Sequence, residues 1–143
     1  MTARPKTPSK RLAVDAVVAS CAASAGIHGA LTPDHFDEGT GAGGGFLAAT
    51  MLLAALATAM LCRPESRSTV AVAGAVFAGL LVAYGLAVTS GVPAFHPDSE
   101  PVEGLAVATK LVEAVGLLAA ASVLRRPGRL RPAPIRRPKG TLT

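Results

Sequence analysis

The chain has 143 residues, of which half are apolar, 16% are charged and 3% are aromatic. This composition argues against a soluble domain, whose core would take much of its buried area from aromatic side chains. The net charge of +5 lies outside the long apolar stretches, and without a folded reader motif or stacking aromatics it does not indicate a nucleic-acid-binding protein.

Four apolar segments are long enough to cross a bilayer. They cover residues 12–31, 46–62, 69–90 and 104–124. A membrane-spanning helix needs roughly 17 to 25 apolar residues, and backbone groups in lipid must pair internally, which favours helices over strands. The sequence therefore predicts an all-α protein, a four-transmembrane-helix bundle made of two helical hairpins. The expected domains are a basic tail over 1–11, the membrane domain over 12–124, and a disordered, basic, Pro-rich tail over 125–143.

The first apolar segment also resembles a cleavable signal peptide. A basic stretch precedes it, and Ala23-Ser24-Ala25 has the spacing of a cleavage site. An uncleaved span is the preferred interpretation, because Asp15 interrupts the apolar run and the apolar character continues to Leu31. Asp15 lies within about one turn of the end of the span, four residues after Arg11, so we expect it to reach the headgroups.

The positions of Lys and Arg predict the orientation of the bundle. Thirteen of these 14 residues lie in the two tails and in the joint between the second and third spans. The other two joints contain no Lys or Arg but hold six acidic residues: Asp34, Asp37, Glu38, Asp98, Glu100 and Glu103. Cytoplasmic loops are the ones enriched in Lys and Arg. We therefore expect both termini and the middle joint in the cytoplasm.

The glycine-rich segment over residues 39–44 matches the spacing of a dinucleotide-binding loop. No strand precedes it, acidic residues lie just upstream, and the Lys-Ser/Thr pair of a phosphate-binding loop is absent. We expect a flexible hinge at which the chain turns back into the bilayer.

Two ionisable residues of the fourth span, Lys110 and Glu113, are i,i+3 neighbours and can pair. On insertion scales each costs about 2.5 to 3.5 kcal/mol, whereas the nine Leu and Val residues of the span return about 0.3 to 0.6 kcal/mol each. The span is marginal alone, and His28 of the first span is the candidate partner. We predict an intramembrane polar cluster of His28, Lys110 and Glu113, which acts as a structural ion pair or as a proton or ion relay.

All three histidines fall on the predicted outer face. Imidazole suits Zn and Cu, so a transition-metal site is an alternative to simple packing. Its candidate ligands are His28, His35, Glu38 and His96. No local metal motif exists, because His28 and His35 are seven residues apart, and we expect no other cofactor.

The run from His28 to Glu38, with its Pro33-Asp34-His35-Phe36-Asp37-Glu38 loop before a span, resembles small four-helix integral membrane proteins of actinobacterial type. Gly91-Val92-Pro93, followed by acidic residues and a last helix with Lys110 and Glu113, resembles them too. The resemblance extends over about residues 25–124. It implies a four-helix bundle in a bacterial plasma membrane, and it implies no activity.

No serine nucleophile motif, paired-cysteine motif or HExxH is present, and we expect a non-enzymatic protein. The preferred function is a structural or accessory subunit that packs against other membrane subunits or a second copy, because small residues at Ala71, Ala75 and Gly79 form one helix face. The alternative is an outer-face Cu or Zn carrier or a proton-binding relay. It would use His28, His35, Glu38, His96 and Glu113. The C-terminal tail, with seven basic residues, is expected to attract anionic lipid headgroups.

Overall fold

The computed structural model of the chain describes residues 8–64, 66–91 and 104–125, which form four α-helices and no strand. The helices are α1 (Pro8–Glu38), α2 (Thr40–Cys62), α3 (Arg67–Ser90) and α4 (Gly104–Arg125). Each is long and apolar enough to cross a membrane by length and composition. The prediction of an all-α chain with four long apolar helices is confirmed, and these helices indicate a multi-pass membrane protein.

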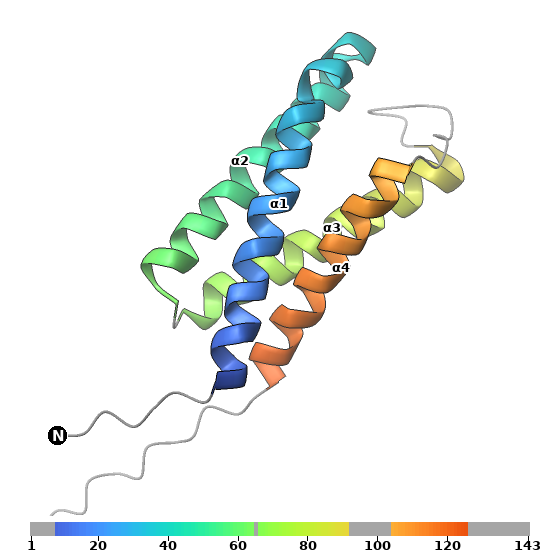
Figure 1. Cartoon of the computed structure of the whole chain (residues 1–143). Coiled ribbons are helices and arrows are strands. Elements are labelled where there is room, and N and C mark those ends of the chain that lie inside the picture. Colours follow the sequence, from blue (N-terminus) through green and yellow to red (C-terminus); the bar gives the residue numbers. More distant parts are fainter. Residues whose placement is uncertain (1–7, 65, 92–103, 126–143) are drawn as a thin grey trace, which may run out of the picture.

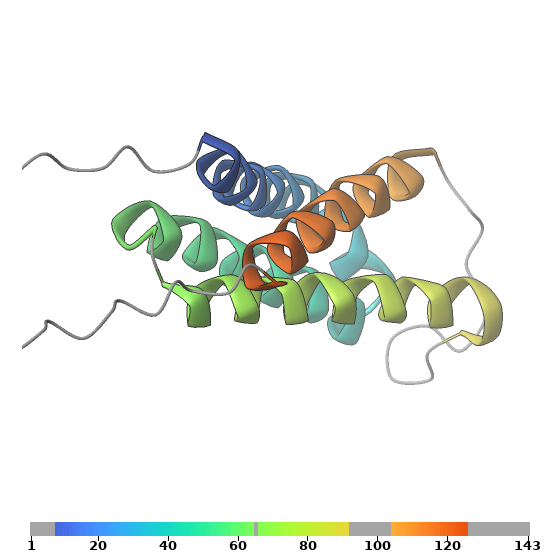
Figure 2. The same ribbon diagram turned by 90° about the horizontal axis from the view of Figure 1, so that it is seen from below.

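The four helices are joined mainly through α1. This helix packs along α2 on one side and along α4 on the other, while α3 packs against α4 (Figure 1). In contrast, α3 makes little contact with α1 or α2. The view from below shows α4 crossing α3 obliquely, with α1 beyond it (Figure 2). The contact between α1 and α4, here called the α1–α4 seam, therefore holds the first and second halves of the chain together.

The seam is built around one aromatic ring and several small residues. Phe77 of α3 is fully buried, and so are Val17 and Cys21 of α1 and Ala120 of α4. A Cβ atom added at Gly116 would collide with the Phe77 ring and would lie 2.8 Å from Cβ of Ser20. Glycine at this position is therefore what allows α4 to approach both α1 and α3.

Local sequence explains where α2 ends and where α3 begins. Pro64 disfavours helical backbone at Arg63, which adopts φ −138° and ψ 70° and ends α2. The Ser66 hydroxyl accepts a hydrogen bond from the Thr69 backbone N–H at 3.3 Å and caps α3. At the other end of α3, Gly91 has a φ of 69°, a conformation that glycine adopts without strain.

The joint between α1 and α2 differs from the sequence prediction. The expected hinge over residues 39–44 is wrong beyond Gly39, because α1 continues through Pro33 to Glu38 and α2 begins at Thr40. Packing overrides the local turn signals: the Phe36 ring lies over Gly43, where a Cβ would collide with it. With 31 residues, α1 is about 46 Å long, longer than a hydrocarbon core of about 30 Å.

Candidate functional site

The polar side chains of the seam converge on Glu113 of α4, which is 0% exposed. Its Oε1 accepts a hydrogen bond from the Ser24 hydroxyl at 2.9 Å. Its Oε2 accepts one from the Lys110 ammonium at 2.7 Å. The Nε2 atom of His28 lies 3.9 Å from Oε1. The structure thus brings together the three residues predicted to form the cluster and adds a fourth, Ser24; we call these four residues the Glu113 cluster.

His28 is held in place by two helices besides α4. Its Nδ1 lies 2.9 Å from the backbone carbonyl oxygen of Ser24, within α1. A carbonyl oxygen only accepts hydrogen bonds, so Nδ1 carries the proton in this contact, and Nε2 is the atom that faces Glu113. The ring also packs against Phe46 of α2, with centroids 5.1 Å apart. The imidazole is therefore oriented toward the carboxylate by its own helix and by α2.

Lys110 is paired within the protein rather than extended to the membrane surface. Its side chain is 17% exposed, and its Nζ lies 5.5 Å from the centroid of the Tyr84 ring on α3. An ammonium at this distance from a ring face is attracted by the ring's quadrupole. The Tyr84 hydroxyl has no hydrogen-bond partner among the described residues. The Glu113 cluster therefore connects α1 and α4 directly, and it reaches α3 through Tyr84.

Sequence reasoning missed Ser24, although a signal for it exists. Ser24 precedes His28 by four residues, so both side chains lie on one face of α1. We interpreted Ser24 only as the middle of a possible cleavage site. In the structure it is fully buried, and its hydroxyl donates a hydrogen bond to Glu113 across the seam between α1 and α4.

Comparison with known proteins gives no relative. No protein-family model matches the chain, and no curated protein or solved structure matches it. The geometry of the Glu113 cluster and of the helix surfaces therefore carries the functional interpretation.

The predicted metal ligands are only partly described. His35 stacks on Phe46 at a centroid distance of 3.6 Å, its Nδ1 lies 2.9 Å from the Leu31 carbonyl oxygen, and its Nε2 lies 4.0 Å from Oε2 of Glu38. Among the described residues, no group of three or more His, Cys, Asp or Glu side chains is arranged to hold a metal ion. His96 lies outside them, so the metal site stays a prediction.

Asp15 and the glycine-rich segment, both noted in the sequence, take no part in the cluster. Asp15 is exposed near the start of α1. Cys21 is buried in the core and Cys62 is exposed at the end of α2, and both thiols are free. The glycine-rich segment contributes to the first turns of α2 rather than to a phosphate-binding loop.

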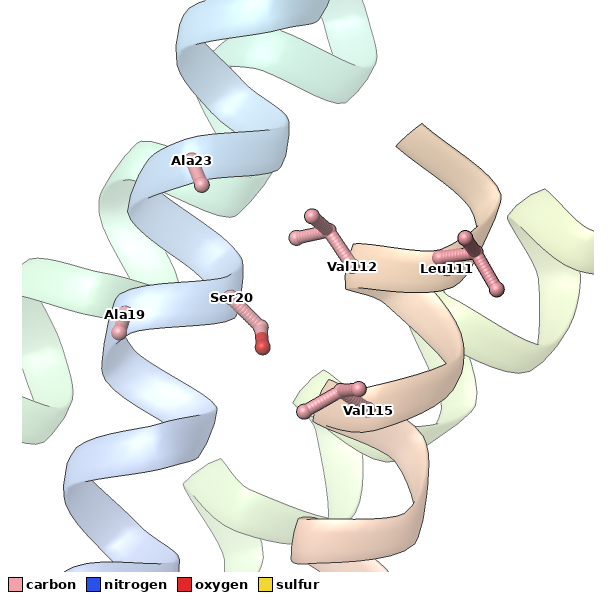
Figure 3. A pocket seen from close by; sticks show the side chains of 6 residues that line it. All are labelled: Ala19, Ser20, Ala23, Leu111, Val112 and Val115. Atoms are coloured by element: carbon pink, nitrogen blue, oxygen red, sulfur yellow. The ribbon is translucent and has the colours of Figure 1, made fainter. Parts of the chain in front are cut away.

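A groove runs along the outer side of the seam (Figure 3). In Figure 3, Val112 and Val115 extend from α4 toward the small side chains of α1. The groove is lined by Ala19, Ser20, Ala23, Leu111, Val112 and Val115. Nearly all of these groups are apolar, so the groove suits an apolar neighbour within the bilayer rather than a polar substrate.

Proposed function

We propose that this chain is a non-enzymatic structural or accessory subunit of a membrane assembly, packing against other membrane subunits or a second copy. One observation carries the proposal: the face of α1 beside the groove is exposed and made of small residues. These are Ala19, Ala22, Ala23, Gly26 and Ala30. A Cβ added at Gly26 would meet nothing within 4 Å. In lipid, where no hydrophobic force drives helices together, such small-residue faces allow close helix packing.

A second exposed face supports the same proposal. Ala71, Ala75 and Gly79 of α3, the face noted in the sequence, are all exposed, and a Cβ at Gly79 would meet nothing within 4 Å. Because α3 packs mainly against α4, this side of the helix is open to another membrane helix.

The Glu113 cluster fits a structural role in such a subunit. Both carboxylate oxygens of Glu113 are already bound by side chains of the chain itself, Ser24 and Lys110. A buried carboxylate satisfied in this way fixes the relative position of two helices. We infer that the Glu113 cluster fixes α1 against α4, so that the exposed small-residue face of α1 keeps a fixed position for packing against a partner helix.

The proposal is tested by enlarging the α1 face. Gly26→Leu is expected to weaken association by about tenfold or more, since overpacking a close contact typically costs 1–3 kcal/mol. Association is measured by native purification and by energy transfer between labelled copies in nanodiscs. Ala55→Leu is the matched control, because Ala55 is exposed on α2 about one turn after the larger exposed side chains of Met51 and Leu52. Purification of the wild type as a monomer with no partner would contradict the proposal.

The proposed location is a bacterial plasma membrane, and the proposed topology is two helical hairpins with both termini in the cytoplasm. This topology is supported by the exposed basic residues Lys10 and Arg11 at the start of α1 and Arg125 at the end of α4. A retained first span is supported by Ser24 and His28, which bind into the seam.

Cysteine labelling tests this orientation. In a Cys21→Ala background, the exposed thiol of Cys62 at the end of α2 is expected to react with a membrane-impermeant maleimide in inverted vesicles and not in intact cells. Thr40→Cys in a background lacking both native cysteines is the matched control, because Thr40 is exposed at the opposite end of the same helix. It should be labelled only from outside, and the reverse pattern would overturn the orientation.

A second candidate function is an outer-face metal or proton-binding protein. Two histidine–carboxylate pairs favour it, His28 with Glu113 and His35 with Glu38. Metal analysis of the purified protein tests the metal form. Copper or zinc should be retained at one ion per chain and lost in His28→Ala, and an apo protein that binds neither ion excludes it.

A further inference from the structure

The basic residues at one end of the bundle are gathered by the fold. Apart from Lys110, the Lys and Arg residues that the structure describes are Lys10, Arg11, Arg63, Arg67 and Arg125. They lie where α1 begins, where α2 passes into α3 and where α4 ends, which is one end of the bundle in Figure 1. The opposite end of the α1–α2 pair exposes Asp34, Asp37 and Glu38. The folded chain is therefore strongly polarised along its long axis.

Three of these arginines are brought to one corner of the bundle by a hydrogen bond of Arg67 and by a tight backbone turn. The Arg67 guanidinium donates a hydrogen bond from Nη2 to the Leu124 carbonyl oxygen at 2.5 Å, which ties the start of α3 to the end of α4. Arg125 is the next residue along α4. On the other side, the Ser66 backbone N–H donates to the Arg63 carbonyl oxygen at 3.1 Å, so a tight turn keeps Arg63 near Arg67. We call Arg63, Arg67 and Arg125 the arginine corner.

The positive charge of the arginine corner favours an anionic neighbour. Arg63 and Arg125 are exposed, and like charges held close together repel each other unless an anion offsets them. The sequence places a single acidic residue, Glu65, in the joint, so the joint and the end of α4 together carry more positive than negative charge. The corner lies at the ends of helices that are long and apolar enough to cross a membrane, and the ends of such helices reach the headgroup region of a bilayer. Guanidinium groups bind phosphate oxygens in a bidentate manner.

We propose that the arginine corner binds the headgroup phosphate of an anionic phospholipid. All three residues belong to the folded bundle: Arg125, the first residue of the tail predicted from the sequence, ends α4 in the structure, and no other tail residue is part of the site. It is independent of the proposed subunit role, because it lies at the end of the bundle and not on the small-residue faces of α1 or α3. It is also independent of orientation when both leaflets contain the same lipid.

The test titrates the detergent-solubilised full chain with phosphatidylglycerol and with phosphatidylcholine and counts bound lipid by native mass spectrometry. The wild type is expected to prefer phosphatidylglycerol. Arg63→Gln with Arg125→Gln should weaken phosphatidylglycerol binding by about 30-fold, roughly fivefold per arginine, from a contribution of about 1 kcal/mol for each basic residue near the surface. Both substitutions leave the Arg67–Leu124 hydrogen bond in place, and an unchanged unfolding transition checks that the fold is retained.

A second double variant is the control, because it removes two positive charges outside the arginine corner. Lys10→Gln with Arg11→Gln neutralises two basic residues at the start of α1 and is expected to change the affinity of the corner by less than about threefold. Equal loss in both double variants would mean diffuse attraction and would overturn the corner site. Equal affinity of the wild type for the two lipids would overturn it as well. Competition by inorganic phosphate as effective as by lipid would show that free phosphate is the ligand and would overturn the lipid assignment.

Discussion

Replacing Gly116 by leucine is expected to destabilise the folded bundle by about 3 kcal/mol or more, the upper range for overpacking a close contact. The first carbon of the new side chain would already collide with the Phe77 ring and crowd Cβ of Ser20. Phe77 is fully buried and cannot turn outward without leaving the core. The helix α4 would have to move away from α1, and this movement would stretch the hydrogen bond between Ser24 and Glu113, which is 2.9 Å long.

Two single glycine-to-alanine substitutions distinguish the effect of this collision from the general effect of replacing a glycine in a helix. Gly116→Ala should still destabilise by about 1–3 kcal/mol, whereas Gly85→Ala of α3, where a Cβ meets nothing within 4 Å, should be neutral or stabilising by about 0.5–1 kcal/mol. The measurement is unfolding in mixed micelles with increasing dodecyl sulfate, followed by circular dichroism. If Gly116→Leu unfolds at the same dodecyl sulfate fraction as the wild type, α4 does not approach α1 and α3 as closely as the structure indicates.

The existence of the four helices could be predicted from hydropathy because each span is a local property of the sequence. The joint between α1 and α2 could not, because its local signals and its packing disagree. Pro33 and the glycines after Glu38 favour a loop. In the folded chain, His35 stacks on Phe46 at 3.6 Å, and Phe36 lies over Gly43. These contacts stabilise helix on both sides of Gly39 and depend on tertiary structure that no short window of sequence contains.

The members of the Glu113 cluster that follow from local sequence could be predicted, and those that depend on the packing of two helices could not. Lys110 and Glu113 are three residues apart on one helix, so their pairing follows from helical geometry, and the predicted outer-face position of His28 makes it a candidate partner. Ser24 and Gly116 were not singled out as site or packing residues, because serine and glycine are ordinary residues in membrane helices. Their importance depends on the packing of α1 along α4, two helices at opposite ends of the sequence. Knowing which face of α1 turns toward α4 would have identified Ser24 directly.

Loss of the ion pair between Lys110 and Glu113 is expected to have an equally large effect on stability. Glu113→Leu is expected to destabilise the bundle by about 3–5 kcal/mol, because it leaves the Lys110 ammonium in the interior without its carboxylate. The Lys110 side chain is 17% exposed, and its ammonium bonds to Glu113 at 2.7 Å. The nearest other attraction among the described residues is the Tyr84 ring at 5.5 Å, which is too weak to replace an ion pair. The stability is measured by the same dodecyl sulfate unfolding.

Adding Lys110→Leu to Glu113→Leu is expected to restore the stability to the wild-type value or above it, since apolar residues that replace a buried ion pair are often neutral or stabilising by 1–4 kcal/mol. The double variant also removes two charges that each cost about 2.5–3.5 kcal/mol when α4 inserts into the bilayer. The Ser24 hydroxyl loses its acceptor but can turn to a backbone carbonyl one turn earlier in α1. A double variant that folds and still assembles would show that the ion pair within α4 serves stability alone and has no further function. A double variant that folds but loses function would show that the carboxylate does more than join α1 to α4. A double variant no more stable than Glu113→Leu would contradict the prediction, because it would show that the lost hydrogen bond from Ser24, rather than the unpaired lysine, destabilises the single variant.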